Sequence, residues 1–233
     1  MNPYLATVLT FAIAIAFLRI MDYFAHRGWI GSKLSRKLIH IGTGPIFVLC
    51  WLLFPDQPIS RYLAALVPLL ITVQFILVGT GVIKDEAAVQ AMTRTGNPRE
   101  ILRGPLFYGV MFVLLTVLYW KDSPIGITAL MMMCGGDGIA DIVGRRVQSP
   151  KLFWSIEKSV AGSLSVFAGG ALMTAFVLFV YINAGVFAAP FQTYFVPILW
   201  TALGGTLIES LPFKDIDNIT LTAVSAVIGH WVF

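Results

Sequence analysis

The sequence predicts an all-α protein, a polytopic bundle of helices that crosses a membrane seven or eight times. Three observations favour this fold class. First, 58% of the 233 residues are hydrophobic and only 12% are charged, whereas about a quarter of the residues in soluble domains carry charge. Second, apolar runs recur along the whole chain, and several approach the roughly 20 residues that a helix needs to cross a bilayer. Third, the basic residues gather in alternate connections between these runs, which is typical of multi-pass membrane proteins.

The apolar runs are expected to form the membrane spans in chain order. The shorter runs reach only about 14 or 15 residues, so they must tilt or include flanking residues in order to cross. No repeat, low-complexity tract or long linker divides the chain, so residues 1–233 are predicted to form a single domain. The runs cover residues 5–18, 38–54, 62–83, 106–120, 125–143, 160–182, 194–207 and 219–233.

The positive charges predict the orientation of the chain. They follow the first apolar run instead of preceding it, so this run is expected to stay as a span and not to be a cleaved signal. The odd-numbered connections hold 14 of the 16 basic residues, which places these connections on the cytoplasmic or stromal-type side. Every polar motif described below then faces one compartment.

The same features exclude several other classes of protein. Membrane orientation already explains the net charge of +4, and the sequence has no long basic run or RNA-binding signature, so no nucleic-acid partner is expected. Cys50 and Cys134 lie in apolar runs and are expected to be buried, inert thiols, with no disulfide or zinc site.

The most informative motif is GGDGIADIVGRR, at residues 135–146. An ionisable group at membrane depth is costly unless it lines a cavity or binds something, so Asp137 and Asp141 are candidates for function. In a helix the two side chains would lie on one face, roughly 6 Å apart along the axis and about 40° apart around it. This spacing suits a metal ion, and Arg145 and Arg146 follow one turn later.

Three other polar clusters accompany this motif. Acidic residues that hold a divalent metal, basic residues that hold phosphates and glycines that admit a close backbone are the parts that phosphoryl transfer requires. This combination of residue types predicts a membrane enzyme that uses a nucleotide. The sequence lacks the phosphate loop, the kinase glycine-rich loop and the Rossmann fingerprint. The clusters are SRKLIH (35–40), NPREILRGPLFYG (97–109) and ESLPFKDIDN (209–218), and the aspartate motif continues in SIEKSVAGS (155–163).

These clusters, in this order, resemble the phytol kinase branch of the polyprenol kinase family, which also contains dolichol kinases. The resemblance extends from residue 35 to residue 220 and is carried mainly by EILRGPLFYG and by GDGIADIVGRR followed by EKSVAGS. More distantly, the aspartate motif with KSVAGS is similar to the nucleotide site of the membrane phosphatidate cytidylyltransferases. The resemblance implies CTP as the nucleotide triphosphate, Mg²⁺ as cofactor, an isoprenoid alcohol as acceptor and a site embedded among membrane lipids.

The resemblance also implies roles for individual residues. Asp137 and Asp141 match the metal-coordinating acids, and together with Lys158 they are the predicted catalytic residues. The predicted contacts to the nucleotide phosphates are Arg145, Arg146, Lys158 and Ser159, with Gly162 keeping the backbone open beside them. Further candidate site residues are Lys37 and His40 of an RK-x-x-H element, Glu100 and Arg103 beside the membrane surface, and Glu209, Asp217 and Asn218 of an E…DN element.

The expected activity is transfer of the γ-phosphoryl group of CTP to the terminal hydroxyl of phytol or a related prenol, with an aspartate such as Asp141 also able to accept the alcohol proton. Two alternatives stay open: a CTP-dependent lipid cytidylyltransferase, and a transporter whose aspartates bind a translocated cation. Individual residues have alternatives too. The aspartates could pair with the arginines as a structural cluster, the basic residues could only anchor the topology, His40 could be an interfacial residue, and Glu209 could cap a polar pocket.

Overall fold

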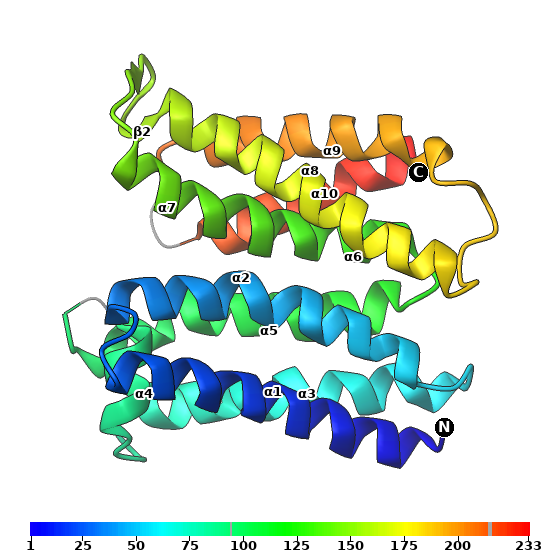
Figure 1. The fold of residues 1–233 in the computed structure, drawn as a ribbon, viewed down its shortest axis with the longest axis horizontal. Coiled ribbons are helices and arrows are strands. Elements are labelled where there is room, and N and C mark those ends of the chain that lie inside the picture. The colour runs from blue at the N-terminus through cyan, green and yellow to red at the C-terminus, as the bar shows by residue number, and fades with distance from the viewer. Residues whose placement is uncertain (94, 214–215) are drawn as a thin grey trace. The chain divides into compact units, whose positions relative to one another are not determined.

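The computed structural model describes residues 1–93, 95–213 and 216–233 (Figure 1). It confirms the all-α fold class, because helices dominate the described residues and the strands form a single two-stranded hairpin. The chain forms two compact units, Met1–Val117 and Leu118–Phe233, which are described separately below. That residues 1–233 act as one domain stays a prediction.

The first unit is built from long helices joined by short turns. Asn2 caps the first helix by accepting a hydrogen bond from the Tyr4 N–H at 2.9 Å, and proline stands in the first turn of the first and third long helices, where its missing N–H costs nothing. Asp85 caps a short helix in the same way. The elements are α1 (Pro3–His26), α2 (Ser32–Cys50), η1 (Trp51–Leu53), α3 (Pro58–Gly79), α4 (Glu86–Met92), η2 (Pro98–Leu102) and α5 (Gly104–Tyr119), whose last turn enters the second unit.

The second unit contains a helix of changing winding, a hairpin and three further helices. The apolar run 125–143 forms α6 (Pro124–Met131), a π-helical segment η3 (Met132–Asp137) and α7 (Gly138–Arg146). A short antiparallel hairpin, β1 (Lys151–Leu152) with β2 (Ser155–Ser159), follows. The unit ends with α8 (Val160–Asn183), α9 (Gln192–Glu209) and α10 (Asp217–Val232).

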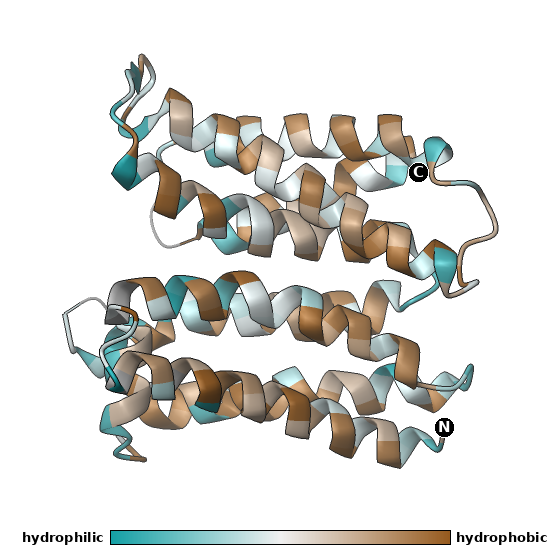
Figure 2. Cartoon of the chain, viewed as in Figure 1, coloured by the Kyte–Doolittle hydropathy of each residue, from teal (hydrophilic) through white to brown (hydrophobic). Residues whose placement is uncertain are grey.

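Six helical stretches among the described residues are long and apolar enough to cross a membrane. The predicted number of seven or eight spans is therefore not confirmed, although the last two apolar runs do form the helices α9 and α10. Figure 2 shows the apolar residues along the helices of both units. The six stretches are Pro3–Ala25, Leu34–Leu53, Pro58–Gly79, Pro98–Tyr119, Pro124–Arg146 and Val160–Asn183.

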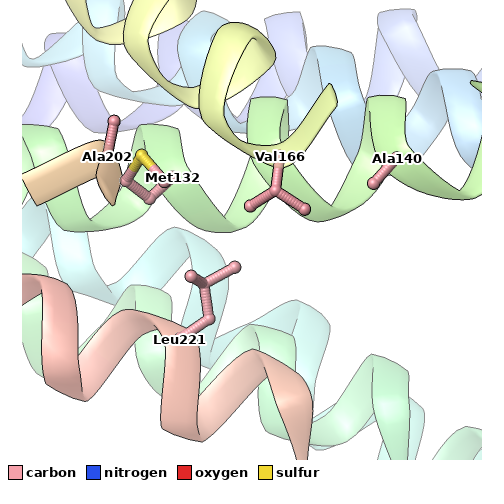
Figure 3. Packing of buried hydrophobic residues seen from close by; sticks show 5 residues of the cluster. All are labelled: Met132, Ala140, Val166, Ala202 and Leu221. Atoms are coloured by element: carbon pink, nitrogen blue, oxygen red, sulfur yellow. The ribbon is translucent and has the colours of Figure 1, made fainter. Parts of the chain in front are cut away.

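The core of the second unit surrounds the π-helical segment. Met132 is fully buried against Val166 of α8, Ala202 of α9 and Leu221 of α10 (Figure 3). Paired glycines let the neighbouring helices approach closely: a Cβ on Gly170 would lie 2.2 Å from the Met132 sulfur. This packing fixes the start of η3, and Asp137 stands at the end of the same segment.

The backbones of η3 and α8 approach each other closely. A Cβ on Gly135 would lie 2.7 Å from the Gly169 carbonyl oxygen, and a Cβ on Gly169 would lie 2.5 Å from the Gly135 carbonyl oxygen. Small residues permit such contacts between helices in membranes. The reciprocal fit sets the position of α8 against the segment that ends in Asp137, one of the two predicted catalytic acids.

Candidate functional site

The predicted site residues of the second unit gather at one end of that unit. Figure 1 shows the end of α7, the start of α8 and the end of α9 there, beside the hairpin. Lys158 stands on β2, Asp137 ends η3, Glu209 ends α9 and Asp217 begins α10. Segments that are far apart in the sequence therefore place one ammonium group and several carboxylates in the same region.

The central contact is an ion pair between Lys158 and Glu209. The Lys158 ammonium donates a hydrogen bond to Oε1 of the Glu209 carboxylate. The Glu209 side chain is 5% exposed and the Lys158 side chain 22% exposed, so the pair is largely removed from water. Removing one partner of a buried pair costs about 3–5 kcal/mol because the other charge is left uncompensated. The pair therefore holds Lys158 in one place.

The electrostatics of this pair show an excess of negative charge. Burial raises the pKa of Glu209 to about 7; Lys158 opposes this shift, whereas Asp137 and Asp217 add to it. Burial by itself would lower the pKa of Lys158, but Glu209, and then Asp137 and Asp217, raise it above its ordinary value. Acidic groups thus favour bound protons on both members of the pair, and a cation placed among them would be stabilised for the same reason.

The two aspartates of the GGDGIADIVGRR motif have different surroundings. Asp137 acts electrostatically on Lys158 and Glu209. Asp141 lies in the first turn of α7, where its Oδ1 accepts from Arg145 Nε at 2.9 Å and lies 2.8 Å from Arg145 Nη2. The i,i+4 pair that could be purely structural is thus present for Asp141, while Asp137 acts electrostatically on Lys158.

The described residues contain no group of three or more His, Cys, Asp or Glu side chains spaced to hold a metal ion, and Lys214 and Asp215 lie outside them. Two carboxylates are nevertheless enough for Mg²⁺, which usually keeps several waters and takes its remaining ligands from substrate phosphates. The negative charge around Lys158 also suits a cation. The chemistry of the residues is therefore compatible with the predicted ion.

The residues predicted to contact phosphates surround the start of α8. Ser159 caps α8 by accepting a hydrogen bond from the Gly162 N–H at 3.2 Å. Gly162 packs near Gly144 of α7, since a Cβ on Gly144 would lie 3.6 Å from the Gly162 Cα. The lack of a side chain at Gly162 therefore allows α7 and α8 to approach each other, and the Gly162 N–H is already hydrogen-bonded. Arg146 is exposed at the end of α7.

Two groups in this region were not singled out by the sequence. The Ser163 hydroxyl is buried and has no hydrogen-bond partner among the described residues. The Trp154 indole N–H donates to the Ser210 carbonyl at 3.1 Å and lies 3.2 Å from the Ser210 hydroxyl. Ser163 belongs to the KSVAGS segment, so its motif was a signal, but nothing in the sequence links Trp154 to Ser210.

The remaining predicted residues are Asn218, Lys37, His40, Glu100 and Arg103. Asn218 is buried in the first turn of α10, next to Asp217. The other four belong to the first unit. The His40 carbonyl accepts a hydrogen bond from the Tyr108 hydroxyl at 2.7 Å, and their rings lie 4.4 Å apart.

Glu100 is in η2, where its carboxylate accepts from the Thr95 hydroxyl, and Arg103 ends this turn. Lys37 and His40 lie on α2, so the RK-x-x-H element and the NPREILRGPLFYG segment meet within the first unit through His40 and Tyr108.

Comparison with known proteins identifies similar sequences from plants. The chain is 38% identical over 230 residues to a probable phytol kinase 1, chloroplastic, of Oryza sativa subsp. japonica, with 98% of this chain and 73% of that protein covered. It is 36% identical over 230 residues to phytol kinase 1, chloroplastic, of Arabidopsis thaliana (98% and 76% covered). It is 37% identical over 227 residues to farnesol kinase, chloroplastic, of Arabidopsis thaliana (97% and 74% covered). No family model and no solved structure matches the chain.

Proposed function

Since this chain belongs to the phytol kinase family and is a kinase of prenyl alcohols, we propose that it transfers the γ-phosphoryl group of CTP, with Mg²⁺, to phytol or a closely related prenol. A bond forms between the prenol oxygen and the γ-phosphorus, and the bond from this phosphorus to the β,γ-bridging oxygen breaks. CDP leaves, and the hydroxyl proton passes to a carboxylate. The observation that carries the proposal is the buried Lys158–Glu209 pair among acidic groups.

Lys158 would bind the phosphates of the nucleotide. Its ammonium is held by Glu209 in a largely buried position, which supplies a fixed positive charge of the kind that stabilises a transferring phosphoryl group. Ser159 stands at the start of α8 together with the Ser163 hydroxyl, which finds no hydrogen-bond partner in the part of the chain that the structure describes, and a helix N-terminus favours anions. Arg145 and Arg146 at the end of α7 would add further positive charge.

Asp137 and Asp141 would hold Mg²⁺ together with the nucleotide phosphates. The ion, when bound, neutralises charge on the phosphoryl oxygens. Asp137 fits this role because it already contributes to the negative charge that raises the pKa of Lys158. Asp141 is paired with Arg145, which orients its carboxylate, and this carboxylate would bind the ion or accept the hydroxyl proton.

The acceptor accounts for the membrane setting. Each buried CH₂ is worth roughly 0.8 kcal/mol, so a tail of about twenty carbons keeps the alcohol in the lipid. Only its hydroxyl must reach the end of the helices.

We place the motif-bearing loops on the cytoplasmic or stromal-type side. Cysteines introduced at Asn97 and Lys151 should therefore react with a membrane-impermeant reagent from one side, and a cysteine at Gln57 from the other.

The kinase reaction is tested with purified protein, a panel of prenols and CTP labelled at either the γ- or the α-phosphate. The γ-label should appear in a prenyl monophosphate and the α-label in CDP. Label from the α-phosphate in lipid, with γ-label in pyrophosphate, would replace the kinase with a cytidylyltransferase. No nucleotide turnover with any lipid alcohol or phosphate would favour a transporter.

A matched pair of lysines tests the nucleotide contact. Lys158→Ala should raise the KM for the nucleotide and lower kcat by orders of magnitude. Lys151→Ala is the control, because Lys151 lies on the same hairpin and its ammonium bonds only the Glu157 carbonyl at 3.1 Å among the contacts described for it. Equal effects of the two substitutions would remove Lys158 from the site.

A further inference from the structure

We propose that two loops beside the candidate site form an apolar rim that inserts into the surface of the lipid bilayer. The rim consists of Phe153 and Ile156 on the hairpin and of Leu211 and Phe213 on the loop that follows α9. Lipid, and not another protein, is the partner. The lipid contact itself is independent of the reaction, whereas its role for the substrate rests on the proposed function.

The hairpin exposes apolar side chains that a loop in water would avoid. Phe153 is 94% exposed and Ile156 is 87% exposed. In the second loop, Leu211 is 37% exposed and Phe213 is 38% exposed. Single exposed apolar residues are common, but a group of large ones at one place marks an interaction surface.

The two loops are held together as one surface. The Trp154 indole N–H reaches Ser210, which immediately precedes Leu211, and Lys158 reaches Glu209. These contacts fix the hairpin to the end of α9, so Phe153 and Ile156 stay exposed while their neighbours Trp154 and Lys158 are engaged. The exposure is therefore a property of the folded unit.

The chain itself identifies the partner. The hairpin connects the membrane-crossing stretch Pro124–Arg146 to the next stretch, Val160–Asn183, through residues 147–159. A connection of this length that is anchored to α9 stays at the membrane surface. Aromatic and aliphatic side chains there are placed at the boundary between headgroups and acyl chains. The exposed Lys151 ammonium on the same hairpin suits the headgroup layer.

The rim places the lipid boundary next to Lys158, because Ile156 precedes Lys158 by two residues on β2. Under the proposed function, the hydroxyl of a prenol would meet the nucleotide phosphates where its tail leaves the lipid. The rim would thus favour long acceptors over short ones without touching the reacting atoms.

The test measures membrane depth directly. Phe153→Cys and Ile156→Cys are labelled with an environment-sensitive fluorophore in protein reconstituted into nanodiscs; the native Cys50 and Cys134 are buried. Lipids with a nitroxide near the headgroup should quench both labels several-fold more than aqueous iodide does. Glu157→Cys is the control, since side chains alternate along a strand, and iodide should dominate there. Iodide quenching of all three labels would overturn the lipid contact.

This measurement needs neither nucleotide nor prenol, so its failure would not be confused with failure of the kinase assignment. In an active enzyme, the double substitution Phe153→Ser and Ile156→Ser should raise the KM for a twenty-carbon prenol about tenfold and leave the KM for a ten-carbon prenol within twofold. An equal rise for both prenols would overturn the role of the rim in acceptor use.

Discussion

Trp154 of the hairpin and Ser210 at the end of α9 are joined by the indole N–H, which lies 3.1 Å from the Ser210 carbonyl oxygen. Ser210 follows Glu209, the partner of Lys158. The same two segments are thus connected by a neutral and by a charged hydrogen bond. The contacts that dock the hairpin on the end of α9 therefore also position Lys158.

Trp154→Phe should raise the KM for the nucleotide about fivefold with kcat nearly unchanged at saturation. The substitution keeps an aromatic ring but loses one hydrogen bond, which is worth about 1 kcal/mol. The measurement is initial rate against nucleotide concentration. Trp231→Phe is the matched control, because Trp231 is exposed near the end of α10. A loss of folded protein without a change in KM would make Trp154 purely structural.

The pKa of Glu209 predicts how stability depends on pH. Since folding raises the pKa of Glu209 from 4.5 to about 7, its stabilising effect is fully present below pH 4.5 and is lost as the pH rises through 7. The change is worth at most roughly 3 kcal/mol. Glu209→Gln should therefore flatten the fall in Tm between pH 5 and 8, whereas Glu157→Gln, at an exposed position on the hairpin that carries Lys158, should not. An unchanged slope in Glu209→Gln would contradict the shift.

Asp137→Asn and Asp141→Asn should each lower kcat by orders of magnitude while leaving Tm within a few degrees. The amide keeps the shape of the side chain but loses the charge that would hold Mg²⁺. Rates measured against Mg²⁺ concentration should show weaker dependence on the metal. Asp122→Asn, an exposed aspartate of the same unit, is the control. Normal turnover of Asp141→Asn would leave the Asp141–Arg145 pair as a structural contact.

Gly169→Ala should destabilise the second unit by about 1–3 kcal/mol and lower activity, because the new Cβ would lie 2.5 Å from a backbone oxygen of η3 that cannot move aside. Thermal unfolding in detergent measures the effect. Gly31→Ala provides the comparison, since a Cβ at Gly31 would meet no atom within 4 Å. If both variants unfold at the same temperature, the close approach of η3 and α8 is not required.

The helices were predictable because each apolar run carries its own signal. The run 5–18 lies within α1 and the run 160–182 within α8. The π-helical winding of η3 was not predicted, and neither was the packing of Gly135 against Gly169, because these two residues are far apart in the sequence. The hairpin was not predicted either, because β1 has only two residues and because Trp154 is held by a hydrogen bond to Ser210 at the distant end of α9.

The site shows the same division. The residue types of the GGDGIADIVGRR and KSVAGS motifs indicate phosphates and a metal by local chemistry alone. The pairing of Lys158 with Glu209 bridges 51 positions, so it follows from how α9 packs beside α8, not from any motif. Sequence therefore predicts which groups are present, and the fold decides which of them meet.

The buried pair has a consequence for protons. Glu209 keeps part of its negative charge because Lys158 is beside it, so phosphates that share the Lys158 ammonium would bring further negative charge near the carboxylate and raise its proton affinity. Nucleotide binding near neutral pH would then be accompanied by proton uptake. The binding heat would differ between buffers of different ionisation enthalpy, and this difference would vanish in Glu209→Gln. Binding of the nucleotide and binding of the proton would be thermodynamically linked.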